Sequence, residues 1–133
     1  MHYRKFTLLI IIFILILSII TGCGNIEGYG NAKLQNLLES IDSGNFENFK
    51  KDLDNNLKEK YTEDEFIKLS KEVKEKFGEY KKYSTEFISS NTEGRLTTAY
   101  FYATYSNNPK VKVQIKFSLE IEVYKISDFN FES

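Results

Sequence analysis

The spacing of apolar residues changes near Gly78, from a helical repeat before it to a strand repeat after it. In the first half, apolar side chains recur every three or four residues, which aligns them along one side of each helix. They are Leu34, Leu37, Leu38, Ile41, Phe46, Phe49, Leu53, Leu57, Phe66, Leu69, Val73 and Phe77. In the second half, apolar residues from Val111 to Phe117 alternate with polar ones, as in a half-buried strand. Helices and strands that follow each other in this way pack as separate layers, so the pattern predicts an α+β domain.

Capping and turn residues predict where these elements begin and end. The segment 43–45 (Ser-Gly-Asn) should end the first helix, and Asn45 can cap the next. Thr62 and Glu65 form a capping box, and Gly78 suits a helix C-terminus. The expected strands cover residues 80–89, 96–105, 110–117 and 121–131, with turns at 91–94, 107–109 and 118–120. We therefore expect N-terminal helices packed on a curved, cone-like antiparallel sheet of about four strands.

Residues 1–22 have the features of a secretory leader. Arg4 and Lys5 precede an apolar stretch whose unbroken part, Leu8 to Leu17, is 10 residues long. A helix that spans a membrane needs about 20 apolar residues, so this stretch is too short to span one. Its basic start and short apolar stretch predict a signal peptide. Its removal leaves 111 residues with 16 basic and 19 acidic side chains. The resulting net charge of −3 excludes a strongly cationic nucleic-acid binder.

The segment Ile20-Thr21-Gly22-Cys23 resembles the lipobox of bacterial lipoproteins. The resemblance implies that a signal peptidase recognises Ile20, Thr21 and Gly22, and that Cys23 becomes a lipidated N-terminus. Two or three acyl chains hold a protein firmly on a bilayer. We therefore expect a cell-membrane lipoprotein whose domain faces the extracytoplasmic side. An uncleaved anchor helix remains the alternative, and it would place the domain on the same side.

Three glycines follow the cysteine within residues 24–31 and predict that residues 23–31 form a lipidated flexible tether. Residues 32–133 then form a single α+β domain. Three segments of this domain resemble the nuclear transport factor two-like superfamily, including small bacterial lipoproteins of unknown function. They are 41–46 (Ile-Asp-Ser-Gly-Asn-Phe), 77–80 (Phe-Gly-Glu-Tyr) and 124–126 (Tyr-Lys-Ile). The resemblance implies a cone in which helices cover a curved sheet, and a cystatin-like α+β domain is the nearest alternative.

The inventory of reactive side chains is small. The only histidine, His2, lies in the leader, and the only cysteine is the lipidation site Cys23. A chain without these side chains cannot build a Ser-His-Asp triad, a Cys-His pair or a zinc site. We therefore predict that the protein is not an enzyme and uses no cofactor. An enzyme that works with a buried carboxylate and a tyrosine or lysine remains the alternative.

One segment has the spacing of a calcium loop. Asp52, Asp54, Asn56 and Glu63 occupy its positions 1, 3, 5 and 12. However, Leu57 stands where the loop needs glycine for a sharp turn. We therefore interpret these residues as helix charges and predict no metal site.

The strand 96–105 carries the candidate binding residues. They are Ala99, Tyr100, Phe101, Tyr102, Ala103 and Tyr105. Tyr100 and Tyr102 share one side, which would suit an exposed partner site. The small residues Ala99 and Ala103 share the other side with Phe101 and Tyr105, and would either leave room for an apolar ligand beneath the helices or belong to an ordinary core.

Three lysines, Lys110, Lys112 and Lys116, form either a basic strip beside these tyrosines or a solvated strand edge. Together these features predict a membrane-anchored, extracytoplasmic, non-catalytic module that binds an envelope ligand or protein and does not bind nucleic acid. A structural or inhibitory surface protein is the remaining alternative.

Overall fold

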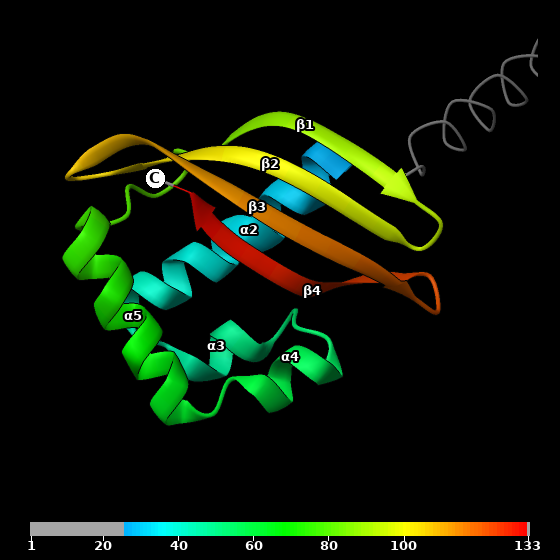
Figure 1. The fold of residues 1–133 in the computed structure, drawn as a ribbon, viewed down its shortest axis with the longest axis horizontal. Coiled ribbons are helices and arrows are strands. Elements are labelled where there is room, and N and C mark those ends of the chain that lie inside the picture. The colour runs from blue at the N-terminus through cyan, green and yellow to red at the C-terminus, as the bar shows by residue number, and fades with distance from the viewer. Residues whose placement is uncertain (1–25, 133) are drawn as a thin grey trace, which may run out of the picture.

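A computed structural model describes residues 26–132, which form helices followed by strands (Figure 1). The helices are α2 (Ile26–Ser43), α3 (Phe46–Lys50), α4 (Asn55–Lys60) and α5 (Glu63–Phe77). The strands are β1 (Glu86–Glu93), β2 (Leu96–Tyr105), β3 (Asn108–Glu120) and β4 (Val123–Glu132). The α+β prediction is therefore confirmed. The expected signal peptide, its recognition residues Ile20, Thr21 and Gly22, and the lipidation site Cys23 lie outside the described residues.

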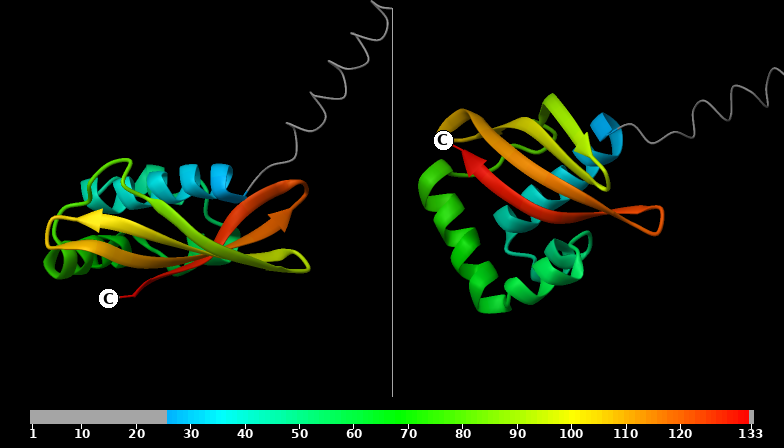
Figure 2. Two further views of the ribbon diagram at one scale, coloured as in Figure 1. Left: turned by 90° about the horizontal axis from the view of Figure 1, so that it is seen from above. Right: turned by 45° about the vertical axis from the view of Figure 1, so that its right-hand side comes forward.

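The four strands form one antiparallel sheet in the order β1-β2-β3-β4. The sheet is curved and does not close on itself, and the helices lie on one of its faces only (Figures 1 and 2). Within residues 26–132, no helix is both long and apolar enough to cross a bilayer. The fold therefore has one sheet face buried beneath helices and one sheet face without them.

The core lies between α2 and the covered face of the sheet, and α3, α4 and α5 close it at the side. Alternate residues of β2 and β3 are fully buried there, as the predicted alternation requires. Aromatic rings join the layers: the Phe49 ring of α3 lies 4.6 Å from the Phe66 ring and 6.1 Å from the Phe129 ring of β4.

The predicted N-caps Asn45 and Thr62 and the predicted C-cap Gly78 are confirmed. The Asn45 side chain accepts a hydrogen bond from the Asn48 backbone N–H at 3.1 Å and begins α3. Thr62 begins α5 by accepting one from the Glu65 N–H at 3.3 Å. Gly78 ends α5 with a φ of +85°, in the left-handed region that glycine adopts without a Cβ penalty.

The prediction of a flexible tether is wrong for residues 26–31, because α2 already begins at Ile26. The Tyr29 ring stacks on Tyr124 with 4.8 Å between ring centroids. Gly30 is buried so closely against Phe117 that a Cβ would lie 3.4 Å from that ring. Glycine costs a helix only about 1 kcal/mol, and aromatic packing against the sheet outweighs this cost.

Several strand boundaries also differ from the prediction: β1 runs on to Glu93 through most of the expected turn at 91–94, and β3 already begins at Asn108, within the expected turn at 107–109. β1 begins at Glu86, not at Tyr80, which forms only an isolated bridge to Tyr105. The last turn is formed by Ile121 and Glu122, because Glu120 of β3 already pairs with Val123 of β4. The predicted turn at 118–120 is therefore part of β3. The ends of these strands depend on how they pair with their neighbours in the sheet. The sequence of one strand alone does not give its register with the next strand.

Candidate functional site

The helix-free face of the sheet, here called the open face, carries the side chains that point away from the core. Because directly opposed residues of an antiparallel pair share a face, the register identifies its members. They are Glu86, Ser89, Asn91 and Glu93 of β1, Leu96, Thr98, Tyr100 and Tyr102 of β2, Lys112, Gln114, Lys116 and Ser118 of β3, and Lys125, Asp128, Asn130 and Glu132 of β4. Every strand contributes, so the sequence's candidate Tyr100/Tyr102 pair lies in the middle of a larger surface.

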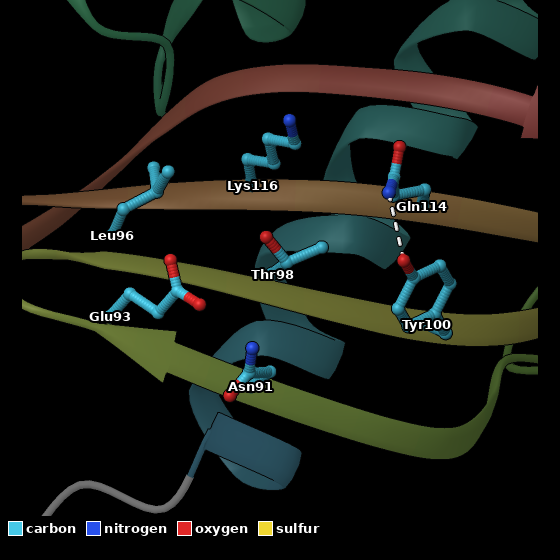
Figure 3. Close-up of a pocket in the computed structure, with 7 residues that line it drawn as sticks. All are labelled: Asn91, Glu93, Leu96, Thr98, Tyr100, Gln114 and Lys116. Atoms are coloured by element: carbon cyan, nitrogen blue, oxygen red, sulfur yellow. Dashed lines mark hydrogen bonds between the residues drawn. The ribbon is translucent and has the colours of Figure 1, made fainter.

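Tyr100 is fixed by its neighbours on β3. Its hydroxyl accepts a hydrogen bond from Gln114 Nε2 at 3.0 Å (Figure 3). The Lys112 ammonium lies 4.9 Å from the centroid of the Tyr100 ring and 3.7 Å from the Glu132 carboxylate. Lys110 makes a similar approach to Tyr102, at 5.4 Å from the ring centroid. These contacts restrict the conformations of both tyrosine side chains.

A shallow hollow of about 300 Å³ lies beside Tyr100 on this face. It is lined by Asn91, Glu93, Leu96, Thr98, Tyr100, Gln114 and Lys116 (Figure 3). Amide, hydroxyl and charged groups dominate this lining, and the hollow is open to solvent. Small-molecule sites usually enclose most of their ligand between apolar walls. The hollow therefore fits a projecting group of a larger partner better than a small molecule.

The expected basic strip is not cationic as a surface. The lysines Lys110, Lys112, Lys116 and Lys125 share the open face with the carboxylates of Glu86, Glu93, Asp128 and Glu132. The alternative interpretation of the three β3 lysines as a strand edge is also wrong, because β3 lies between β2 and β4. The open face therefore carries charges of both signs among polar groups and would not attract a strongly charged partner by its net charge.

The other side of β2 belongs to the core. Ala99, Phe101 and Ala103 have no accessible surface, and Tyr105 is 2% exposed. A side chain without accessible surface borders no space large enough for a water molecule, so these alanines leave no room for an apolar ligand. The interpretation as ordinary core packing is confirmed for these four residues, and the candidate binding residues reduce to Tyr100 and Tyr102.

Tyr105 is a titratable group buried in this core. Its hydroxyl is buried without a hydrogen-bond partner among the described residues. Burial, and then the nearby Tyr80 and Asp42, raise the pKa of Tyr105 above its usual value. The hydroxyl therefore stays protonated at neutral pH and is poorly suited to act as a general base.

We expect Tyr105→Phe to stabilise the fold by about 1 kcal/mol at pH 7, because it removes an unsatisfied buried hydroxyl. The pKa of Tyr105 is raised in the folded state, so the folded protein keeps this hydroxyl neutral while the unfolded chain ionises above about pH 10. The stability of the wild type is therefore unaffected by the ionisation of this group below pH 10 and falls as the pH rises from there towards the pKa of the folded state. The advantage of the variant should therefore grow above pH 10, as measured by urea unfolding at each pH. Tyr102→Phe, whose ring is half-exposed, is the matched control and should change stability by less than about 0.5 kcal/mol. Equal behaviour of the two variants would contradict the buried, unpaired state of Tyr105.

The residues with calcium-loop spacing have other roles. Asp54 caps α4 by accepting a hydrogen bond from the Leu57 N–H at 2.8 Å, and Asp52 pairs with Lys33 at 3.3 Å. Glu63 lies in the first turn of α5. Within residues 26–132, no three histidine, cysteine or acidic side chains gather in a way that could hold a metal ion.

Comparison with known proteins gives a family without an assigned activity. A family model described as "Protein of unknown function (DUF3887)" matches residues 34–126, which is more than half of the chain. The match runs from the first core leucine of α2 to Ile126 of β4 and so includes Tyr100, Tyr102 and Gln114. No curated protein matches the chain.

Proposed function

The chain belongs to the DUF3887 family, and we propose that it is an extracytoplasmic lipoprotein that binds a protein partner of the cell envelope through the open face. The observation that carries this proposal is a sheet face without helices, on which fixed tyrosines lie among amide and hydroxyl groups. The proposed role is recognition and not catalysis.

The lipid anchor is supported by the sequence at residues 20–23, where a lipobox-like tetrapeptide follows a short apolar stretch. α2 begins only three residues after Cys23, so an acylated Cys23 would hold the domain directly against the membrane surface. The order of helices and curved sheet also supports the likeness to the nuclear transport factor two-like fold, which we propose for this chain. The filled core at Ala99 and Ala103 favours binding on the sheet surface over binding beneath the helices.

A protein partner is favoured by the chemistry of the open face. Tyrosine is enriched at protein interfaces, since its large rigid ring buries much surface at little entropic cost. Tyr100 is already held by Gln114 and Lys112, so even less freedom is lost on binding. The hollow beside it can receive one projecting side chain of the partner, while Asn91, Thr98 and Asn130 supply hydrogen-bonding groups around it.

We expect Cys23→Ala to abolish incorporation of a labelled fatty acid, because the thiol is the acceptor for the lipid. The measurement is metabolic labelling of cells that express the full chain, followed by fractionation of membranes. Thr21→Ala is the matched control: it keeps a small residue in the lipobox and should retain the label. Fatty-acid labelling of the Cys23→Ala variant would overturn the anchor.

A photoreactive benzoylphenylalanine in place of Tyr102 should crosslink the anchored protein in intact cells to one partner of defined mass. The same residue in place of Ile67, which is 57% exposed on α5, is the control and should give no such product. Adding Tyr100→Ala should reduce the crosslink at position 102 without unfolding the domain. Absence of a product at 102, or an identical product from 67, would overturn binding through the open face.

A further inference from the structure

We infer that the end of the sheet formed by the β1–β2 and β3–β4 turns touches the lipid bilayer, with Ile121 inserted among the acyl chains. This inference rests on the proposed lipid anchor and adds the orientation of the domain on the membrane. This apolar end adjoins the open face and shares Leu96 with it.

Apolar side chains gather at this end without being part of the core. Ile121 is 95% exposed, Val123 47% and Leu96 41%. The β1–β2 turn is joined to the end of β3 by a hydrogen bond from the Leu119 N–H to the Arg95 carbonyl at 2.9 Å. Ile121, Val123 and Leu96 therefore belong to one connected edge, and each loses exposed apolar surface if that edge meets a membrane.

The N-terminus of α2 lies at the same end of the molecule. Figures 1 and 2 place the first turn of α2 in the half of the molecule that holds the β1–β2 and β3–β4 turns, while the end of β4 and the β2–β3 turn lie at the opposite end. The stacked rings of Tyr29 and Tyr124, 4.8 Å apart, join α2 to the strand that leaves the β3–β4 turn. Only two residues lie between Cys23 and Ile26, so an extended chain separates their Cα atoms by at most about 11 Å. An acylated Cys23 would therefore bring this apolar end to the interface.

The backbone at the tip argues for a role outside folding. Ile121 and Glu122 form a two-residue turn with φ values of +44° and +63°. Such turns strongly favour Asn-Gly, and a β-branched residue at positive φ is an outlier. The chain therefore places a large apolar side chain, fully exposed, where a polar residue would fold more easily. A residue that is unfavourable for its turn and gains no packing contacts in return is expected at a functional position.

The charges around the tip favour a shallow contact. Glu120 and Glu122 flank Ile121, and Arg95 and Lys125 lie on the adjoining strands or turn. Buried carboxylates are costly in hydrocarbon, so they would remain among the headgroups while the isoleucine passes between them. In this orientation the strands lead away from the membrane, and Tyr100 and Tyr102 on the open face stay accessible to a partner.

The test uses the full acylated chain reconstituted into phosphatidylcholine vesicles, with an environment-sensitive fluorophore on an introduced cysteine. Because Cys23 would be a thioether, Ile121→Cys provides the only reactive thiol. Tyr83→Cys is the control: Tyr83 is 79% exposed, and its neighbours Lys81 and Ser84 are bonded to Thr104 near the far end of the sheet. We expect the probe at 121 to be quenched several-fold more strongly by nitroxide-labelled lipid than the probe at 83.

The outcomes separate this inference from the proposed anchor. Protein that floats with the vesicles while both probes are equally accessible to aqueous iodide overturns the insertion of Ile121 and leaves the anchor standing. Protein that carries no acyl group and does not float overturns the anchor, and the orientation with it. Selective lipid quenching at 121 that disappears when Val123→Thr and Leu96→Thr are added supports the whole apolar edge as the contact.

Discussion

Phe49→Ala is expected to lower the free energy of unfolding by about 3–5 kcal/mol, the usual loss for a buried phenylalanine. Phe49 is 1% exposed, and its ring contacts Tyr61, Phe66 and Phe129 at centroid distances of 5.3, 4.6 and 6.1 Å. It therefore joins α3 to α5 and to β4. Removing the ring would leave a cavity that rings held by other elements cannot fill. Urea unfolding followed by circular dichroism measures this loss.

The control for this variant is Ile67→Ala, which removes an apolar side chain from the exposed side of α5. Ile67 is 57% exposed, and alanine is the best helix former, so stability should change by less than about 0.5 kcal/mol. A loss below about 1 kcal/mol for Phe49→Ala would mean that α3 is not packed into the core as described.

The ends of the helices could be predicted because they depend on residues close in sequence. Asn45 and Thr62 cap N–H groups three residues ahead, and Gly78 supplies a left-handed conformation at the end of its own helix. The alternation from Val111 to Phe117 likewise assigned every side chain of that stretch to its correct face. Helix ends and the buried face of a strand can therefore be predicted from capping residues and from the spacing of apolar residues, without knowing which other element packs against them.

The start of α2 and the last turn could not be predicted because distant contacts decide them. The glycines of segment 26–31 predict a flexible tether. In the structure, however, Tyr29 packs against Tyr124 and Gly30 against Phe117, two residues near the other end of the sequence. The turn at Ile121 has no glycine, asparagine or proline to mark it. Its position follows from the β3–β4 register, which the pairing of Ile115 with Phe129 in the core helps to set.

The candidate site was predictable only in part, for the same reason. Tyr100 and Tyr102 fall on one side of their strand by period alone. Gln114, which fixes Tyr100, was missed, because only the β2–β3 register places the two residues opposite each other. The expected turn at 107–109 would have shifted that register, since the structure begins β3 at Asn108. The alternation of residues along a strand predicts the sheet face on which a side chain lies, whereas the register between strands decides which side chains are its neighbours on that face.

The second large effect is expected for Gly78→Ala, which should lower the free energy of unfolding by about 2–5 kcal/mol. Gly78 has a φ of +85° and a ψ of −147°, a backbone conformation that is essentially restricted to glycine and costs another residue about 1–3 kcal/mol. An added Cβ would also overlap the Ser106 hydroxyl and lie 3.1 Å from the Asn107 side chain. The Ser106 hydroxyl accepts a hydrogen bond from the Glu79 N–H at 2.9 Å, and breaking it adds about 1–3 kcal/mol.

Gly44→Ala is the comparison variant for these two contributions. Gly44 has a similar φ of +70° after α2, but a Cβ there meets nothing within 4 Å. It should therefore show only the conformational cost of about 1–2 kcal/mol, as measured by urea unfolding. The additional loss in Gly78→Ala then reports the close approach of the α5 C-terminus to the β2–β3 turn together with the more restricted backbone of Gly78. Equal losses would mean that this approach, and with it the junction between the helical layer and the far end of the sheet, is looser than the structure describes.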